Sequence, residues 1–259
     1  MGGFVTERVA IVTGGAGGIG SAISHRLAAD GYHVVAAYLS AEAVARELVG
    51  SLGEQGYSVS SFKADISKPD QVAALFDDVL HRRGRVDVVV NNAGTAEYRT
   101  LADLDVGTYQ KIFDVNVLGA VNVLREAGRH LGEWGRVINI SSTLVQTSAV
   151  GSAAYAASKA ALEIFGKIAA KELGERFITV NSLRVGPTEP GMFARASAER
   201  RRALAAASPF GRLGQPQDVA DVVSFLASDG GRWITGQVIT VDGGAAALGV
   251  ASSGELTAS

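Results

Sequence analysis

The segment Tyr155-Ala-Ala-Ser-Lys159 carries the most chemically informative spacing in the chain. On a helix, residues four apart lie on one face, so the ammonium of Lys159 can act on the phenol of Tyr155. A free tyrosine ionises near pH ~10 and is a poor base at neutral pH, but a neighbouring cation favours the phenolate. The hydroxyl of Ser142, from the segment Ile140-Ser141-Ser142, could hold a carbonyl oxygen against that phenol. These residues suit proton transfer to or from a substrate oxygen, which requires a partner able to move a hydride.

Elements of two kinds must position these side chains. Expected strands, rich in Val and Ile, span residues 8–13, 33–37, 58–64, 86–90, 136–140, 178–183 and 237–241. Expected helices span residues 18–30, 41–53, 69–83, 105–131, 152–176 and 216–228. Strands that are apolar on successive positions are covered on both faces. The alternation predicts an α/β fold, a doubly wound parallel sheet of the Rossmann type in three α/β/α layers and a single domain.

The domain is expected to cover residues 1–245, with a small, polar C-terminal tail over residues 246–259. One segment, residues 186–209, breaks the strand–helix rhythm and ends in a helix rich in Ala and Arg. Because ligands bind beyond the carboxyl ends of parallel strands, we interpret it as a lid over the substrate. The alternative is an ordinary packed helical insert.

Composition excludes several kinds of function. The net charge of −2 gives no general attraction for nucleic acid or for an anionic membrane. The chain has no cysteine, which excludes disulfides and thiolate chemistry, and its four histidines show no spacing typical of metal ligands. No apolar run approaches the ~20 residues that span a bilayer. We therefore expect a soluble, cytoplasmic protein without a metal and without nucleic-acid or membrane partners.

A glycine-rich loop follows the first expected strand, with the sequence Gly14-Gly-Ala-Gly-Gly18-Ile19-Gly20. Glycines tolerate positive φ and let a pyrophosphate approach bare backbone amides at a helix N-terminus, where the helix dipole favours an anion. The spacing fits both G-x-G-x-x-G and G-x-x-x-G-x-G. The alternative is a glycine-rich turn that binds nothing.

Several further motifs occur in a fixed order. They are the Thr13-Gly-x-x-x-Gly-x-Gly20 loop, Asp65 after the third strand, Asn91-Asn92-Ala93-Gly94 after the fourth, Asn116 in the next helix, Ser142, Tyr155, Lys159, Asn181, and Ile234-Thr-Gly-Gln237 leading to Val241-Asp-Gly-Gly244. With them the chain resembles the short-chain dehydrogenase/reductase family from Thr13 to about Gly244. Ser142 lies at the usual family interval before Tyr155, and Ser141 is the second choice.

The resemblance implies a role for each matched residue. Tyr155 would be the acid/base, Lys159 would lower the tyrosine pKa and bind the nicotinamide ribose, and Ser142 would orient the substrate oxygen. Asn116, the fourth catalytic residue, would hold a water behind Lys159. The implied cofactor-binding residues are Gly14, Gly18, Ile19, Gly20, Tyr38, Ser40, Asp65, Ile66, Asn92, Ala93, Gly94, Tyr155, Lys159, Gly186 and Thr188. The alternatives are structural: the asparagines could satisfy loop amides, and Asp65 could cap the following turn.

The choice of nicotinamide cofactor depends on the end of the second strand. NAD-binding relatives usually place an acidic residue there for the ribose 2′-hydroxyl, whereas this chain has Tyr38. The absence of a carboxylate favours NADP, with Tyr38 and Ser40 as hydrogen-bond donors to its 2′-phosphate. NAD stays possible, because Gly17 occupies the loop position where NADP-binding relatives often carry arginine.

The resemblance implies a hydride transfer between this cofactor and a carbonyl or secondary-alcohol substrate. A second hypothesis is a 3-oxoacyl-[acyl-carrier-protein] reductase, for which Arg129 and Arg176 could form a basic patch near the site. A third is a dinucleotide-binding scaffold without catalysis. Val185 and Pro190 depart from the family pattern and put the lid geometry in doubt, while Met192, Phe193 and Phe210 suggest a partly apolar pocket.

The expected helices 105–131 and 152–176 carry more apolar residues than one sheet face needs. We therefore expect a four-helix contact between subunits and a homotetramer. The alternative is that these faces pack entirely within one subunit.

Overall fold

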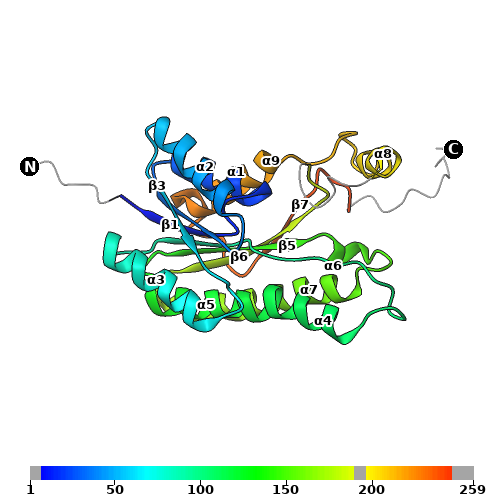
Figure 1. The fold of residues 1–259 in the computed structure, drawn as a ribbon, viewed down its shortest axis with the longest axis horizontal. Helices are drawn as coiled ribbons and strands as arrows, with labels where there is room; N and C mark the ends of the chain where they lie inside the picture. The colour runs from blue at the N-terminus through cyan, green and yellow to red at the C-terminus, as the bar shows by residue number, and fades with distance from the viewer. Residues whose placement is uncertain (1–6, 190–196, 247–259) are drawn as a thin grey trace, which may run out of the picture.

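A computed structural model describes residues 7–189 and 197–246, and within them seven strands form one parallel sheet in the order β3-β2-β1-β4-β5-β6-β7 (Figure 1). The strands are β1 (Val9–Thr13), β2 (His33–Tyr38), β3 (Val59–Lys63), β4 (Val88–Asn91), β5 (Arg136–Ser142), β6 (Thr179–Val185) and β7 (Val238–Val241). The doubly wound parallel sheet expected from the sequence is confirmed. Its order reverses between β1 and β4, which is where ligands bind in such sheets.

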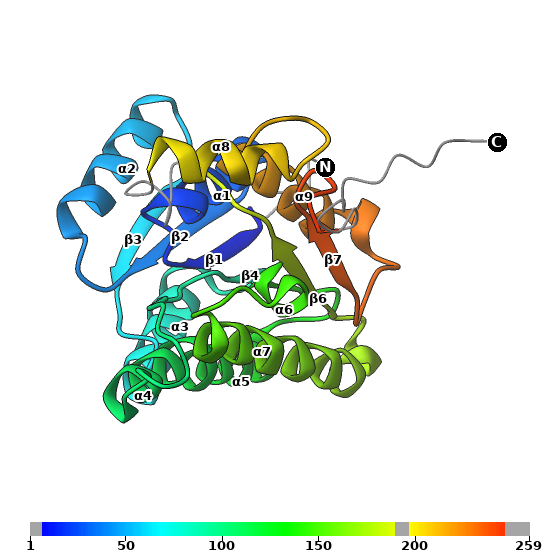
Figure 2. The same ribbon diagram turned by 90° about the vertical axis from the view of Figure 1, so that its right-hand side faces the viewer.

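Helices cover both faces of the sheet and complete the three layers (Figures 1 and 2). One face carries α1 (Gly18–Ala29), α2 (Glu42–Glu54) and α9 (Pro216–Ala227), and the other carries α3 (Pro69–Arg83), α4 (Val106–Phe113), α5 (Ala120–His130) and α7 (Ala153–Glu172). The central strands are buried, and their alternate side chains contribute to two apolar clusters. Along β5, for example, Ile138 and Ile140 belong to one cluster and Val137 to the other.

The expected helix over residues 105–131 is interrupted. After α4 the chain forms a π-helix, η1 (Asp114–Gly119), before α5 begins at Ala120. The wider turn lets Gly119 lie against Ile66, whose side-chain carbons are 2.7 and 2.8 Å from the position a Cβ on Gly119 would occupy. A pattern of apolar residues does not distinguish this local widening from a continuous α-helix, so the sequence did not reveal it.

Two short helices lie near the carboxyl ends of the strands (Figure 2). The sequence analysis did not identify α6 (Leu144–Thr147), which directly follows β5. The expected Ala/Arg-rich helix of the insert is α8 (Ala198–Ala206), which begins with the Ser197 side chain accepting a hydrogen bond from the Arg200 amide. Pro190, Met192 and Phe193 lie outside the described residues, as does most of the expected tail.

The remaining short elements are two 3₁₀ turns, η2 (Gly174–Arg176) and η3 (Asp229–Gly231). Each lies in the connection that leads into one of the last two strands. None of the helices in the described part of the chain is long and apolar enough to cross a membrane.

Candidate active site

The end of β5 and the first turns of α7 bring Ser142, Tyr155 and Lys159 together. Tyr155 and Lys159 are buried, with 5% and 4% of their surface exposed. The Lys159 Nζ donates a hydrogen bond to the Ile140 carbonyl oxygen at 2.9 Å and lies 5.9 Å from the centre of the Tyr155 ring. Ser142 hydrogen-bonds with Tyr155 through its side chain. The three groups therefore meet as the spacing in the sequence indicated.

Burial governs the electrostatics of this cluster. Burial, with a smaller contribution from Tyr98, raises the pKa of Tyr155 to about 12, while the Ser142 hydrogen bond opposes the shift. Burial also lowers the pKa of Lys159 to about 8. The tyrosine is therefore a protonated phenol at neutral pH. The sequence analysis expected Lys159 to lower the pKa of Tyr155. Lys159 is not among the groups that shift this pKa.

Ser141 and Ser142 have different partners. The Ser141 hydroxyl donates to the Glu163 carboxylate at 2.7 Å, and Arg184 donates to both oxygens of that carboxylate at 2.8 and 2.7 Å. The Ser142 Oγ accepts a 3.2 Å hydrogen bond from the Leu144 amide. Of these two serines, Ser142 alone hydrogen-bonds with the Tyr155 side chain among the described residues, and its catalytic role stays a prediction.

Asn116 lies in the π-helix and is buried, with 1% exposed. Its Oδ1 accepts a hydrogen bond from the Thr95 amide at 2.8 Å, and its Nδ2 donates to the Thr95 carbonyl at 2.8 Å and to the Ser158 hydroxyl at 3.0 Å. Gly94 lies beside it, because a Cβ there would be 3.2 Å from both the Asn116 Oδ1 and the Lys159 Nζ. Asn116 thus fixes the loop after β4 against α7; its role in holding a water stays a prediction.

The glycine loop is tightly packed on one side and open on the other. A Cβ on Gly20 would lie 2.1 Å from the Gly14 carbonyl oxygen, whereas a Cβ on Gly17 or Gly18 would have no heavy atom of the described residues within 4 Å. Gly14 and Gly18 have φ of +64° and +51°, which side chains rarely adopt. Helix α1 begins after Gly17 without a side-chain cap, so no capping side chain satisfies its first amides.

Asn92 and Thr13 lock this loop to the strand ends. The Asn92 Nδ2 donates to the carbonyls of Thr13 at 2.9 Å and Gly14 at 3.3 Å. The amides of Asn92 and Ala93 both donate to the Thr13 hydroxyl at 3.0 Å. Asn92 therefore shapes the loop through the backbone, which was the structural alternative weighed for it, and its packing along a cofactor stays a prediction.

Other expected cofactor-binding residues also have partners within the chain. The Asp65 Oδ1 accepts from the Ser67 amide and hydroxyl at 2.9 and 2.7 Å, and its Oδ2 has no hydrogen bond among the described residues. Ile66 and Ile19 both pack against the apolar clusters, Ile66 from a buried position. The Thr188 hydroxyl donates to the Gly186 carbonyl at 3.0 Å.

Lys63 at the end of β3 lies beside Tyr38 at the end of β2, and the sequence analysis did not identify this lysine. Tyr38 and Lys63 are direct partners in the parallel register, so their side chains lie on the same face of the sheet. Lys63 is exposed, as is Ser40 just beyond β2, and Tyr38 is half-buried. Only strand pairing joins residues this far apart, and the sequence order of Tyr38 and Lys63 did not reveal it.

The expected basic patch of Arg129 and Arg176 lies at the wrong edge. Arg176 precedes β6 and donates to the Leu131 carbonyl at 2.9 Å, while Arg129 ends α5 and pairs with Glu126 at 3.0 Å. Both belong to connections that enter the amino ends of β5 and β6, whereas Tyr155 lies at the carboxyl ends. The hypothesis of a basic patch near the site is therefore wrong for these two residues.

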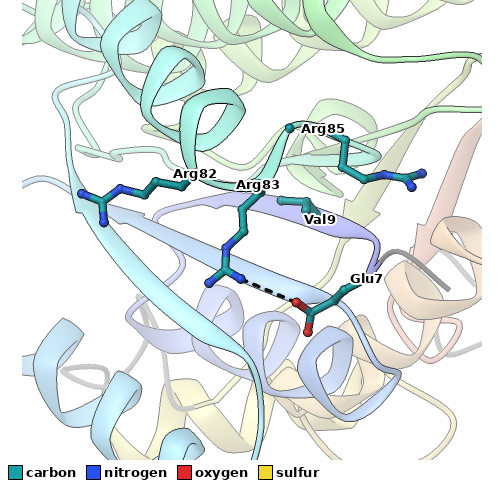
Figure 3. A pocket seen from close by; sticks show the side chains of 6 residues that line it. Glu7, Val9, Arg82, Arg83 and Arg85 are labelled. Atoms are coloured by element: carbon teal, nitrogen blue, oxygen red, sulfur yellow. Dashed lines mark ion pairs between the residues drawn. The ribbon is translucent and has the colours of Figure 1, made fainter. Parts of the chain in front are cut away.

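Two cavities lie at opposite edges of the sheet. One of about 130 Å³ lies at the carboxyl edge, lined by Thr188, Phe210, Val241 and neighbouring residues. The other, of about 500 Å³, lies at the amino edge, where Figure 3 shows Arg83 pointing at Glu7 and the side chains of Arg82 and Arg85 extending away in opposite directions. The larger cavity is remote from Tyr155, so its size does not make it the site of chemistry.

The open side of the glycine loop fits a dinucleotide. The uncapped amides of α1 and the positions at Gly17 and Gly18 suit a pyrophosphate, because no described residue fills the space beside those two glycines. No group of three or more His, Asp or Glu side chains that could hold a metal occurs among the described residues. Fold and site together define a Rossmann-type dinucleotide-binding protein, in which a buried tyrosine and the glycine loop lie at the same edge of the sheet.

Comparison with known proteins gives the family. A family model described as "Enoyl-(Acyl carrier protein) reductase" matches residues 14–246. The chain is 42% identical over 248 residues to a short-chain type dehydrogenase/reductase of Picea abies, covering 92% of each chain. It is 38% identical over 251 residues to a versicolorin reductase of Emericella nidulans, covering 92% of this chain and 95% of that one. The protein belongs to the short-chain dehydrogenase/reductase family and is an oxidoreductase.

A solved structure agrees with this assignment. The angucycline C-6 ketoreductase LanV with bound NADP superposes with a TM-score of 0.88 at 33% identity, covering 93% of this chain and 96% of that one. The fold of this chain is therefore the fold of the family.

Proposed function

We propose that the protein reduces a carbonyl group of a small molecule to a secondary alcohol with NADPH, or catalyses the reverse oxidation. The observation that carries the proposal is the buried cluster of Ser142, Tyr155 and Lys159 at the carboxyl edge of the sheet, on the same edge as the open glycine loop. The cofactor, when bound, supplies and accepts the hydride. The chain supplies alignment and the path of the proton.

Each side chain has a defined task in this chemistry. The Ser142 hydroxyl donates to the substrate oxygen and holds it beside the phenol. The Tyr155 phenol, protonated because burial raises its pKa to about 12, gives its proton to that oxygen during reduction. The Lys159 ammonium stabilises the phenolate that remains, since a cation close to a buried anion is poorly screened. In oxidation the same groups act in reverse.

The test is a panel of ketones and secondary alcohols assayed with both cofactors, on the wild-type protein and on Tyr155→Phe. We expect Tyr155→Phe to lower kcat by about 10³-fold, in the range that a proton donor contributes, with NADPH affinity within about twofold. Tyr57→Phe, which alters a tyrosine packed on His25, is the matched control and should keep full activity. Retained turnover in Tyr155→Phe would refute the proton donor. Tight cofactor binding without turnover of any substrate would support the scaffold without catalysis.

The cofactor preference is argued from the end of β2. The carboxyl ends of β2 and β3 carry two hydroxyls and a cation, which belong to Tyr38, Ser40 and Lys63. No carboxylate lies at the end of β2 to repel a phosphate. The solved relative LanV holds NADP. We assign the ribose 2′-phosphate of NADP to these three side chains.

Lys63→Gln tests this assignment. Losing one cation from an exposed phosphate contact should raise the Kd of NADPH by about five- to tenfold, because a charged hydrogen bond contributes roughly 1 to 1.5 kcal/mol at such a site. The Kd of NADH should stay within about twofold, since it has no 2′-phosphate. Equal changes for the two cofactors, measured by calorimetry, would contradict the role of Lys63.

A carrier-bound acyl substrate is the second candidate, because the description of the matching family model names an acyl carrier protein. The arginines considered for docking such a carrier lie at the opposite edge of the sheet, which disfavours it. Comparing a free ketone with a carrier-bound 3-oxoacyl thioester as substrates discriminates between the two.

We also propose that the protein is a homotetramer. The outer faces of η1 and α7 expose Leu118, Ile164, Phe165 and Ile168, with between 41% and 55% of each surface accessible. Side chains of this size gathered on helices are typical of subunit contacts. Light scattering measures the mass, and a monomeric mass would overturn the proposal.

A further inference from the structure

One aromatic side chain beside the active site has no role in the chemistry above. Tyr98 lies in the loop between β4 and α4, and its ring centre is 6.3 Å from that of Tyr155, with 56° between the ring planes. This separation is within the 4.5–7 Å typical of interacting aromatic pairs. Tyr98 is 39% exposed, so part of its ring stays accessible next to the proton donor.

The backbone on both sides of Tyr98 is anchored. The Glu97 carboxylate accepts a 2.6 Å hydrogen bond from the Lys111 ammonium, which ties the loop to α4. The Arg99 amide donates to the Gly151 carbonyl at 2.9 Å, which ties the loop to the segment just before α7. Gly151 adopts a φ of +81°, and the Arg99 backbone lies 3.7 Å from the position of a Cβ there. Tyr98 is therefore held in place relative to Tyr155 rather than carried on a freely moving loop.

Helix α8 lies near the same carboxyl edge, on the other side of the sheet layer from α4 (Figures 1 and 2). Its Arg200 is close enough to Tyr98 for its charge to act on the Tyr98 phenol, lowering a pKa that burial raises. Tyr98 is therefore near both Tyr155 and Arg200, and under the proposed function it lies beside the part of a substrate that adjoins the carbonyl group.

We propose that Tyr98 is a specificity-determining residue that selects flat, unsaturated ring ketones by stacking its accessible ring on the substrate while Tyr155 holds the carbonyl oxygen. The inference rests on the proposed function. A flat ring can lie against Tyr98 with full contact, whereas a puckered saturated ring of the same size touches it at fewer atoms. The residue acts on substrate affinity and takes no part in proton transfer.

The experiment compares 1-tetralone with trans-1-decalone, two bicyclic ketones that differ in the flatness of one ring. For Tyr98→Leu we expect kcat/KM for 1-tetralone to fall about five- to tenfold, mainly through KM, since stacking contributes at most about one factor of ten. Turnover of trans-1-decalone should change less than about twofold. Tyr98→Phe keeps the ring and should keep the preference, and Tyr57→Phe controls for the loss of a tyrosine elsewhere.

A second readout does not depend on turnover. 1-Naphthol is a flat alcohol that cannot be oxidised to a simple ketone. Its Kd and that of decahydro-1-naphthol are measured by calorimetry in the presence of NADPH, which cannot accept a hydride, so neither alcohol is turned over. We expect Tyr98→Leu to weaken 1-naphthol binding about five- to tenfold and to leave decahydro-1-naphthol within about twofold. A thermal melt of each variant shows whether it is folded.

The outcomes separate this inference from the proposed function. Equal losses for the flat and the saturated ketone in Tyr98→Leu, or an unchanged preference, would overturn the role of Tyr98. A wild-type protein that reduces acyclic ketones but neither bicyclic ketone would overturn the substrate class and leave the carbonyl reduction standing. Retained turnover in Tyr155→Phe would instead remove the proposed function itself.

Discussion

Two buried cations lie at opposite ends of β5, and they differ in the groups that surround them and in whether they can lose a proton near neutral pH. Arg136 opens the strand with 1% of its surface exposed, and Lys159 reaches the strand near its other end with 4% exposed. Both donate to backbone carbonyls, Arg136 to those of Trp134 and Gly135 at 2.7 and 3.1 Å. Neither has an ion pair with a carboxylate in the described part of the chain.

The chemical nature of the cation separates the two sites. Burial lowers the pKa of Arg136, with Arg8 adding to the effect, yet a guanidinium stays charged at any physiological pH. Burial brings the pKa of Lys159 to about 8, which is within reach of the pH at which enzymes work. Lys159 also faces a phenol and Arg136 faces a turn. Lys159 therefore has a neighbouring group on which the proposed chemistry can act, whereas Arg136 serves the backbone at the start of the strand.

Among changes to these two cations, the largest effect is expected for Lys159→Met. We expect kcat to fall by 10²-fold or more, because the phenolate left on Tyr155 loses its neighbouring cation. The wild-type rate of reduction should decline above pH 8, as Lys159 loses its proton, and the variant should lack that decline. The measurement is a kcat profile over pH 6 to 10. A variant with wild-type kcat and the same profile would contradict the role of the lysine.

The same variant should be more stable at neutral pH. The pKa of Lys159 is lower in the folded protein than in the unfolded chain, so the unfolded chain binds more protons between about pH 8 and 10.5. Folding of the wild type is therefore least favoured below pH 8 and gains stability as the pH rises through that window. Lys159→Met should gain roughly 2 kcal/mol at pH 7 and lose this pH dependence, as measured by urea unfolding.

Arg136→Lys tests the buried cation at the amino end of β5. A lysine there would lose one of the two hydrogen bonds to carbonyls and would bury a more strongly hydrated charge, so we expect a loss of about 1 to 2 kcal/mol in unfolding free energy. Its kcat should stay within about twofold, because no reacting group lies at that end. A drop in kcat beyond tenfold in a folded variant would show that the two ends are coupled.

The smallest effect is expected for Arg82→Gln beside the amino-edge cavity (Figure 3). Arg82 pairs with Asp78 at 2.8 Å, but 71% of its side chain is exposed. Solvent screens such a pair, so the change should alter stability by less than about 0.5 kcal/mol and leave catalysis intact. A larger loss, measured by urea unfolding, would show that the cavity has a structural role.

Much of the fold could be predicted because it depends on short-range patterns. Runs such as Val9–Thr13 and Val88–Asn91 are apolar on successive positions, and each became a buried parallel strand. The interruption at Asp114–Gly119 could not be predicted, since a π-helix differs from an α-helix by a small widening that buried packing against Ile66 decides. Lys63 was missed for a related reason: its neighbour Tyr38 becomes close only through strand pairing.

The amino-acid sequence by itself determined the order of strands and helices, the glycine loop and the helical spacing of Tyr155 and Lys159, because each depends on residues near one another in the chain. Only the tertiary structure decided which serine meets the phenol, that Tyr98 lies beside it, and that Arg129 and Arg176 are at the far edge. The tertiary structure also set the pKa of Tyr155 near 12 and that of Lys159 near 8, because the cost of burying a charge depends on everything packed around it.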